Sequence, residues 1–365
     1  MELYKTQSNN RFFEEFVEPR IAKYGKIFKT SLMGSPIVVV NGVEANRFIL
    51  SNEFKLVISS WPSSSVQLTG ILSWKNKGIS TVAFADCEES KARDSKDVGG
   101  SSGRKEKRNG KQLARRGKRS ATIAIGGCND SRGYYGQEVI DNVVLLVFAA
   151  NDTTSFAIAM AFKMLAQHPE CYSLLLQEHA NIINNKRPGE NLVLEDVKKM
   201  KYTWQAARES MRLFPPIFGS FRKAVAGIEY QRFTTPKGWK VLWTAYGTHY
   251  CGVYFQDPQR VDPSRFEEFV PPYVFLPFGG GPSVCAGYQL AKLNILIFVH
   301  YVVTRYNWSL IYPDESITMA PLPFPSQGMP VKISPKLFVK PHEDFFFYLI
   351  IFFVKIICFG FLLLS

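Results

Sequence analysis

The residues with the clearest chemical potential lie in a glycine-rich stretch, Phe275 to Gly287, that contains a single cysteine, Cys285. Gly279 to Gly281, followed by Pro282, exclude a regular helix or strand, so we expect a tight irregular loop. The next segment places apolar residues at helical spacing, as in a helix buried on most sides: Leu290, Leu293, Leu296 and Ile297. Cys285 therefore lies at or just before a helix N-terminus, where unpaired N–H groups and the helix dipole favour a thiolate, the form that binds metal.

Other glycine-rich sites fit this loop less well. A phosphate-binding loop needs lysine directly after the glycines, and the first lysine is Lys292. A nucleophile elbow needs glycine two residues after its serine, where Ser283 is followed by Cys285. Zinc favours paired cysteines, and none of the six lies within four positions of another. A buried cysteine with no chemical role stays open as the alternative for Cys285 alone.

The motif Phe278-x-x-Gly281-x-x-x-Cys285-x-Gly287 resembles the haem-thiolate loop of the cytochromes P450, in which the cysteine is the axial ligand of the haem iron. By this resemblance Cys285 is the metal ligand. Gly281 and Gly287 would let the flat macrocycle approach the backbone, and Phe278 would pack against it. The family usually has arginine two residues before the cysteine, bonded to a haem propionate, and this chain has Ser283.

A long helix is predicted over Val139 to Leu165, ended by His168-Pro169. A polar notch, Asn151 to Ser155, interrupts its apolar residues, and its hydroxyls can bond back to the preceding turn. The notch resembles the oxygen-activating motif of the family's central helix, with Ala150 in place of the commoner glycine. The resemblance implies that Thr153 supports bound dioxygen and that Asp152 relays protons.

Glu209 and Arg212 share one face of the helix expected over Tyr202 to Phe214. Glu-x-x-Arg alone is common by chance. Followed by Arg265 and then Cys285, it resembles the Glu/Arg/Arg triad of the same family, whose implied role is to lock the scaffold on the proximal side of the haem.

The segment after the double proline is expected to line a pocket above the haem. Arg222 matches a family arginine that pairs with a haem propionate. Ile217, Phe218 and Phe221 would make the lining apolar, which suits a hydrophobic substrate.

Charge is concentrated in one part of the chain. The net charge is +13, and residues 91–120 contain twelve Lys/Arg and three Asp/Glu. Low hydrophobicity with high charge is typical of a disordered segment. Because no aromatic residue interleaves the basic ones, the segment lacks a stacking platform, which argues against a nucleic-acid partner. The spacing of the cysteines argues against a disulfide framework and suits a reducing compartment.

Four segments follow from these patterns. Residues 1–72 are expected to form the first helix and small sheet of the P450 fold, with a helix over Phe12 to Tyr24 and strands joined by a turn at Gly34 to Pro36. Residues 73–130 are a basic low-complexity insert, and residues 131–340 form the haem-binding helical core. Residues 341–365 form a hydrophobic tail, and its apolar stretch, Phe345 to Leu364, has about the minimum length for a membrane span. Met1 to Asn10 shows no signal peptide.

The predicted fold class is mainly α with small β-sheets (α+β), a cytochrome P450 fold that is incomplete before the long central helix. The basic insert replaces several family helices, including one that carries a tryptophan and an arginine for the haem propionates. No counterpart of that pair is found.

The resemblance, closest to plant members that oxidise triterpenoids and sterols, implies a monooxygenase with haem as its cofactor. Such an enzyme inserts one oxygen atom of O2 into a C–H bond of a hydrophobic substrate, with electrons from an NADPH-dependent P450 reductase. It would be bound to a membrane, in the endoplasmic reticulum and facing the cytosol. Two alternatives stay open: a catalytically inactive, truncated remnant, and a basic, tail-anchored binding protein.

Overall fold

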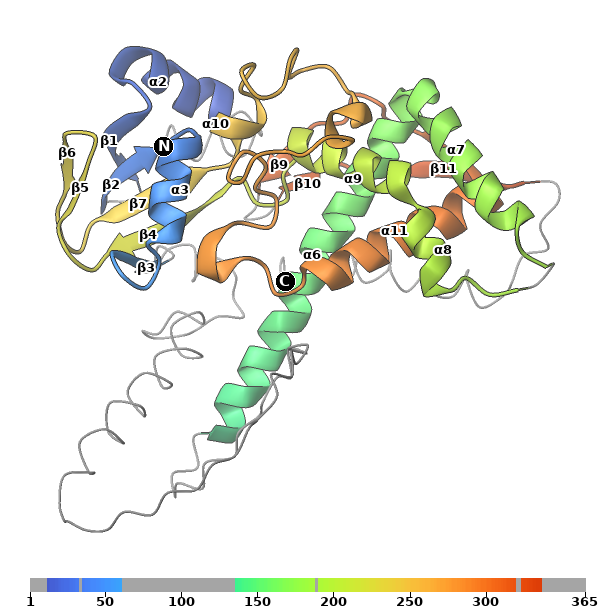
Figure 1. The fold of residues 1–365 in the computed structure, drawn as a ribbon, viewed down its shortest axis with the longest axis horizontal. Helices are drawn as coiled ribbons and strands as arrows, with labels where there is room; N and C mark the ends of the chain where they lie inside the picture. Colours follow the sequence, from blue (N-terminus) through green and yellow to red (C-terminus); the bar gives the residue numbers. More distant parts are fainter. Residues whose placement is uncertain (1–11, 33–34, 61–134, 188–189, 320–322, 337–365) are drawn as a thin grey trace, which may run out of the picture.

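The computed structural model describes residues 12–32, 35–60, 135–187, 190–319 and 323–336. The predicted insert at 73–130 and the predicted membrane segment at 341–365 lie outside the described residues. Within the described ranges, helices dominate and the sheets are small, so the predicted α+β class is confirmed (Figure 1). No helix in these ranges combines the length and the apolar character that crossing a membrane requires.

One five-stranded sheet lies at one end of the molecule (Figure 1). Its strand order is β1-β2-β7-β4-β3. Its strands are β1 (Ile27–Leu32), β2 (Ser35–Val40), β3 (Val57–Ser59), β4 (Gly219–Ala224) and β7 (Lys240–Thr244). Two-stranded sheets pair β5 (Ile228–Tyr230) with β6 (Phe233–Thr235), β8 (Tyr306–Leu310) with β11 (Val331–Pro335), and β9 (Ile317–Met319) with β10 (Pro323–Pro325).

The predicted turn at Gly34 to Pro36 is wrong in its extent. The β1–β2 pairing runs to Leu32 opposite Ser35, so Ser35 and Pro36 belong to the strand. Proline is tolerated there because the parallel ladder between β2 and β7 begins only at Ile37. Pro36 therefore has no partner in β7 that needs its missing N–H.

The sheet joins early and late parts of the chain. β2 pairs in parallel with β7, and β3 pairs with β4. On one face of the sheet, Phe218 and Phe221 are buried in a cluster with Phe28 and Leu242. These two phenylalanines were expected to line a substrate pocket, but they belong to the core of the sheet.

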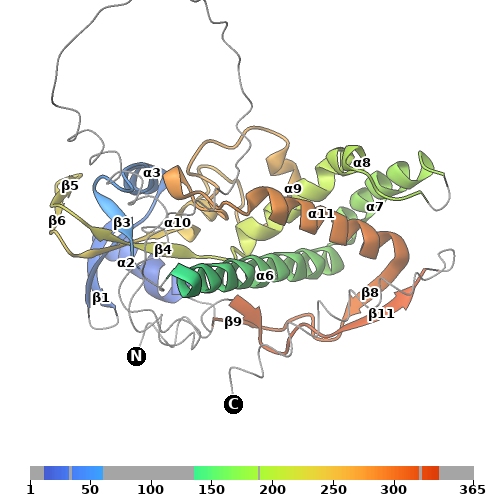
Figure 2. The same ribbon diagram turned by 90° about the horizontal axis from the view of Figure 1, so that it is seen from below.

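Some helices lie next to the five-stranded sheet, and the others form the opposite end of the molecule (Figure 1). The helices are η1 (Phe12–Val17), α2 (Glu18–Tyr24), α3 (Val43–Ser51), α6 (Tyr135–Gln167), α7 (Pro169–Asn184), α8 (Leu194–Lys199), α9 (Lys201–Leu213), α10 (Tyr246–His249), η2 (Pro263–Phe266), η3 (Gly281–Ser283) and α11 (Tyr288–Arg305). Figure 2 shows α6 running beneath α9 and α11, with β8 and β11 on its other side. The main core lies between α6, α9 and α11, where Met160, Met164, Met211, Val299 and Val303 are buried together.

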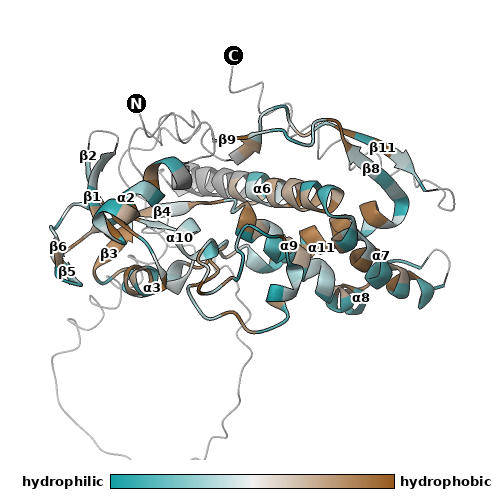
Figure 3. Ribbon diagram, turned by 90° about the horizontal axis from the view of Figure 1, so that it is seen from above, coloured by the Kyte–Doolittle hydropathy of each residue, from teal (hydrophilic) through white to brown (hydrophobic). Residues whose placement is uncertain are grey.

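The predicted central helix is confirmed and is slightly longer than expected, at 33 residues. It ends just before His168-Pro169, as predicted. The helix after Cys285 is also present, but it is not buried on most sides. Leu290, in its first turn, is 55% exposed, and only its later residues, such as Ile295 and Val299, are in the core. Figure 3 shows both hydrophilic and hydrophobic segments on α7 and α8, as expected of helices with one buried side.

Candidate active site

The cysteine loop is held by its own backbone. The Gly279 N–H donates to the Leu276 carbonyl at 3.1 Å, and the Cys285 N–H donates to the Phe278 carbonyl at 2.9 Å. Helix α11 begins three residues after Cys285, with Gly287 as its N-cap. The Cys285 side chain is exposed. The structure thus places an accessible sulfur just before a helix N-terminus, as the sequence predicts.

The two glycines of the motif have different surroundings. Gly281 has a φ of +71°, and a Cβ there would lie 2.1 Å from the carbonyl oxygen of Leu50 in α3. Its lack of a side chain is therefore required by packing against α3, a reason that the motif alone does not reveal. A Cβ at Gly287 would meet only the Cys285 Sγ, at 3.7 Å, among the described atoms. The space beside the sulfur is open at this position.

A haem fits the cysteine side of this site. The exposed sulfur and the uncovered backbone at Gly287 leave room for a flat macrocycle against the thiolate. The Phe278 ring is partly buried against the main core, with its centroid 4.8 Å from that of Tyr288 in an edge-to-face contact. Cys285 would hold the iron, and Gly287 and Phe278 would lie against the ring.

Arg222, the predicted propionate partner, is engaged elsewhere. Its Nε lies 3.0 Å from Glu53 Oε1, and its Nη2 donates to Glu53 Oε2 at 3.2 Å. Its Nη1 donates to Ser220 Oγ at 2.9 Å. Both charged side chains are buried, and burial lowers the pKa of Arg222. Sequence reasoning missed Glu53, because nothing in its local pattern indicates a partner 169 residues away.

The notch of α6 is bonded to its own helix. The Thr153 hydroxyl donates to the Ala149 carbonyl and the Ser155 hydroxyl donates to the Asn151 carbonyl, both at 2.7 Å. Asn151 Nδ2 donates to Asp152 Oδ1 at 3.1 Å, and burial raises the pKa of Asp152. These bonds match the structural role predicted for the notch. Because the Thr153 hydroxyl uses its hydrogen in this bond, both lone pairs of its oxygen can still accept from an incoming donor.

The predicted triad comes together. Glu209 and Arg212 are fully buried and form a bidentate pair, with Nε–Oε2 and Nη2–Oε1 distances of 2.8 Å. Arg265 Nε lies 3.6 Å from the same carboxylate, which also accepts the Asp262 N–H at 2.9 Å. The carboxylate therefore ties α9 to η2.

His249 is a buried residue at this site that sequence reasoning missed. Its Nε2 accepts the N–H of Leu276 at 2.8 Å, and its Nδ1 lies 3.2 Å from the carbonyl oxygen of Arg212. Burial and the nearby Arg212 guanidinium lower the pKa of His249 to about 3, so the ring is neutral. Both partners are main-chain atoms, which leave no signal in the sequence.

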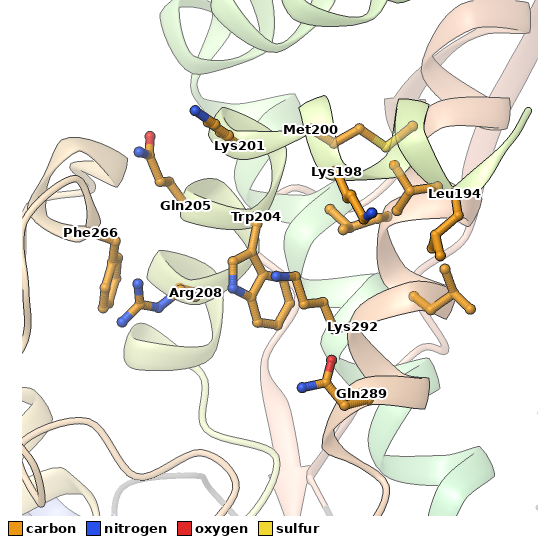
Figure 4. Close-up of a pocket in the computed structure, with 13 residues that line it drawn as sticks. Leu194, Lys198, Met200, Lys201, Trp204, Gln205, Arg208, Phe266, Gln289 and Lys292 are labelled. Carbon is orange, nitrogen blue, oxygen red and sulfur yellow. The ribbon is translucent and has the colours of Figure 1, made fainter. Parts of the chain in front are cut away.

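Two grooves flank α11. The larger, of about 540 Å³, lies between α8, α9 and α11 and is lined by the four cations Lys198, Lys201, Arg208 and Lys292 (Figure 4). We call it the basic groove. Lys292 Nζ stands 5.2 Å from the ring centroid of Trp204, and Arg208 lies over Phe266.

The second groove, of about 320 Å³, runs between α6 and α11 and is lined by residues such as Asn151, Thr154 and Asn294. Neither groove includes Cys285, Asp152 or Thr153. The described residues therefore bring the triad together around its carboxylate, and neither of these two grooves joins the sulfur to the notch.

Comparisons with known proteins bear on the family of this chain. The family model for cytochrome P450 matches residues 125–333. The chain is 33% identical to a taxane 13-alpha-hydroxylase of Taxus cuspidata, over 88% of this chain and 86% of the relative. It is 32% identical to a beta-amyrin 28-monooxygenase of Kalopanax septemlobus, with the same coverage. A protopanaxadiol 6-hydroxylase of Panax ginseng is 43% identical over 54% of this chain and 42% of the relative.

The structure is also similar to that of retinoic acid bound cyanobacterial CYP120A1, with a TM-score of 0.68 and 20% identity, over 92% of this chain and 96% of the other. This likeness concerns the fold alone. The alignment with the taxane 13-alpha-hydroxylase spans 421 positions, more than the 365 residues of this chain, so the relative has residues without counterpart here. That agrees with a P450 fold that lacks part of the usual chain. The match of the family model, the relatives and the fold together show that the chain belongs to the cytochrome P450 family.

Proposed function

We propose that the chain is a haem-thiolate monooxygenase that hydroxylates a hydrophobic, terpenoid- or sterol-like substrate. The observation that carries the proposal is the exposed side chain of Cys285 just before α11, on a residue whose backbone N–H donates to the Phe278 carbonyl. The bound haem would supply activation of O2: one oxygen atom enters a C–H bond, and the other leaves as water with two electrons and two protons.

The chain's own residues would then position and supply protons. Cys285 would hold the iron through its sulfur, just before the N-terminus of α11. Asp152 would carry a proton at its carboxylate, where burial raises the pKa above its ordinary value and the Asn151 amide opposes this by donating a hydrogen bond. The Thr153 hydroxyl, already bonded to the Ala149 carbonyl, would accept or pass on a proton at its oxygen. Glu209, Arg212 and Arg265 would keep the scaffold around the cysteine loop rigid.

The substrate class follows from the relatives. Proteins named for oxidation of taxane, beta-amyrin and protopanaxadiol support a terpenoid-like substrate for this chain. Turnover assays with such compounds and the full chain test the class, and oxidation of only small polar compounds would contradict it.

The electron donor proposed is an NADPH-dependent reductase, which would dock on the basic groove. The groove includes Lys292, in the second turn of α11 and seven residues after Cys285, and its lining contains no carboxylate. An acidic partner surface would be attracted there. We expect Lys201→Glu together with Lys292→Glu to slow reduction of the haem-loaded chain by the reductase, without altering reduction by dithionite.

The proposed location is the endoplasmic reticulum membrane, with the core facing the cytosol. The apolar stretch Phe345 to Leu364 and the membrane-bound members of the family support it. Fractionation of cells that express the full chain tests it, since recovery in the soluble fraction would contradict membrane attachment.

The deciding experiment is spectroscopic. The purified full chain is incubated with haem, reduced and exposed to CO, with Cys285→Ser as the control. We expect the red-shifted Soret band of thiolate ligation in the natural chain and its loss in the variant. Absence of the band in both would contradict the proposal.

A truncated, inactive remnant is the second candidate. It is favoured by Ser283 in place of the family's arginine and by the engagement of Arg222 with Glu53, which together leave no free arginine at either predicted propionate position. A chain that folds but does not retain haem on gel filtration would support this reading.

A further inference from the structure

We propose that His249 is a positioning residue for Cys285. It fixes the main chain that leads into the cysteine loop and thereby sets where the thiolate points. The inference rests on the proposed ligation of haem iron by Cys285, and its first test is independent of haem.

The contacts of His249 lie between two elements. The Leu276 N–H donates to Nε2 at 2.8 Å, so Nε2 carries the lone pair and Nδ1 carries the proton. Nδ1 then donates to the Arg212 carbonyl at 3.2 Å. The ring therefore connects the last turn of α9, which carries Glu209 and Arg212 of the triad, to the start of the cysteine loop.

From Leu276 the connection continues through the backbone. The Leu276 carbonyl accepts the N–H of Gly279, and the carbonyl of the intervening Phe278 accepts the N–H of Cys285. A shift of Leu276 would change the bond from the Gly279 N–H directly. It would also change the bond from the Cys285 N–H, because the Phe278 carbonyl lies only two residues after Leu276. The position of the sulfur thus depends on where His249 holds Leu276.

The ring itself has little freedom. His249 is fully buried, stacks on Phe275 at a centroid distance of 5.3 Å, and has its own carbonyl bonded to Arg212 Nη1 at 2.9 Å. The Arg212 guanidinium is also the charged group that faces the ring, and together with burial it keeps the ring neutral at neutral pH. The ring therefore keeps the same donor and acceptor nitrogens at pH values near neutral.

Burial alone does not distinguish a histidine that positions the loop from one that only fills space. The test must therefore measure the cysteine loop itself. We compare His249→Phe, which keeps a flat ring but removes both hydrogen bonds, with His300→Phe, a matched change at another buried histidine. Amide hydrogen exchange is measured on the haem-free full chain. We expect exchange at Leu276 to Cys285 to rise about tenfold or more in His249→Phe and not in His300→Phe, with α6 unchanged in His249→Phe. Equal acceleration throughout the chain, or none, would overturn the proposal.

Two smaller changes keep the test valid if His249→Phe does not fold. Gln can place an acceptor near the position of Nε2, whereas Asn ends near Nδ1 and cannot reach Leu276. In haem-loaded chains we expect His249→Gln to retain most of the thiolate CO band, and His249→Asn to lose about half or more of it and to shift the reduction potential.

Identical spectra and potentials for the Asn and Gln variants would contradict a positioning role. If the natural chain takes up no haem, the proposed function fails, while the exchange data still decide whether His249 fixes the loop.

Discussion

Gly281 and Gly287 both belong to the cysteine motif, yet the atoms around them impose different requirements. Gly281 has a positive φ and faces the Leu50 carbonyl, whereas Gly287 has an ordinary φ of −82° and faces only the cysteine sulfur. A side chain at the first position disturbs the fold, and a side chain at the second reduces only the space beside the sulfur.

This difference gives a paired prediction. Gly281→Ala should lower the free energy of unfolding of the haem-free chain by about 2–3 kcal/mol, from overpacking against α3 and the positive φ. Gly287→Ala should change it by less than about 0.5 kcal/mol but weaken haem binding. Urea unfolding and haem titration measure the two effects. Equal loss of stability in both variants would contradict this assignment.

Ser283 offers a gain-of-function prediction. It lies in η3, two residues before Cys285, where the family usually has an arginine for a propionate. Because Arg222 is paired with Glu53, Ser283→Arg would supply a free guanidinium. We expect haem affinity to rise about tenfold, the factor for a charge-assisted hydrogen bond near the low end of its range. Ser283→Gln, of similar length without the charge, is the control, and an equal gain in that variant would argue against a propionate contact.

At the residue scale, sequence could predict groups whose own type and spacing are informative. Cys285 before its helix, and Glu209 one turn from Arg212, follow from local patterns that the structure confirms. Glu53 and His249 could not be predicted, because their partners are an arginine far along the chain and backbone atoms of Arg212 and Leu276. A main-chain partner has no residue type that a pattern can detect.

Among the elements, α9 and η2 are joined through one carboxylate. Glu209 accepts from Arg212 and from the Asp262 N–H while fully buried, so replacing it leaves a buried guanidinium without its counter-charge. We expect Glu209→Gln to lower the free energy of unfolding by about 3–5 kcal/mol.

The matched control for the triad is Glu195→Gln, in the exposed pair of Glu195 with Lys198, also three residues apart on a helix. There we expect a change below about 0.5 kcal/mol, because water screens the pair. Denaturant midpoints followed by circular dichroism give both values. A small loss of stability in Glu209→Gln would mean that Arg212 and Arg265 find other partners when the carboxylate is removed.

The helices were easier to predict than the sheet. The ends of α6 follow from its apolar run and from Pro169, which are local signals. The order β1-β2-β7-β4-β3 depends on pairings between residues about 200 positions apart, such as Val39 with Leu242. Register at that distance is set by packing of both sheet faces, which no single strand's sequence contains.

At the scale of the whole molecule, three neutral histidines sit in the core. His179 and His300 join α7 to α11, with their Nδ1 atoms 2.9 Å apart, and His249 joins α10 to the cysteine loop. Burial is the main cause that lowers their pKa values, to about 3 for His179 and His249 and about 4 for His300. Repulsion between the two rings when both carry a proton further lowers the pKa of His179. The positive charge of Arg305 likewise lowers the pKa of His300.

The direction of the pH dependence follows from these values. An unfolded histidine binds a proton near pH 6.5, whereas the folded ones do so only near pH 3 to 4. Between these limits the unfolded state holds more protons, so the free energy of unfolding falls as pH falls. Each histidine contributes up to about 1.4 kcal/mol per pH unit in this window. Most aspartates and glutamates titrate in unfolded chains near or below pH 4.3, so they add little above that pH.

We therefore expect the haem-free chain to lose stability steeply from pH 6.5 to about 4.5, as measured by urea unfolding at a series of pH values. His300→Asn should reduce the slope by about one histidine's share, because it removes that group and one neighbour that lowers the pKa of His179. The comparison variant is His168→Gln, which replaces a histidine that is 34% exposed beside Glu170. A reduction of the slope as large as that in His300→Asn would contradict the role given to burial. A flat profile in this window would show that the buried imidazoles reach water or a counter-charge on protonation, because only then could the folded chain accept the protons without cost.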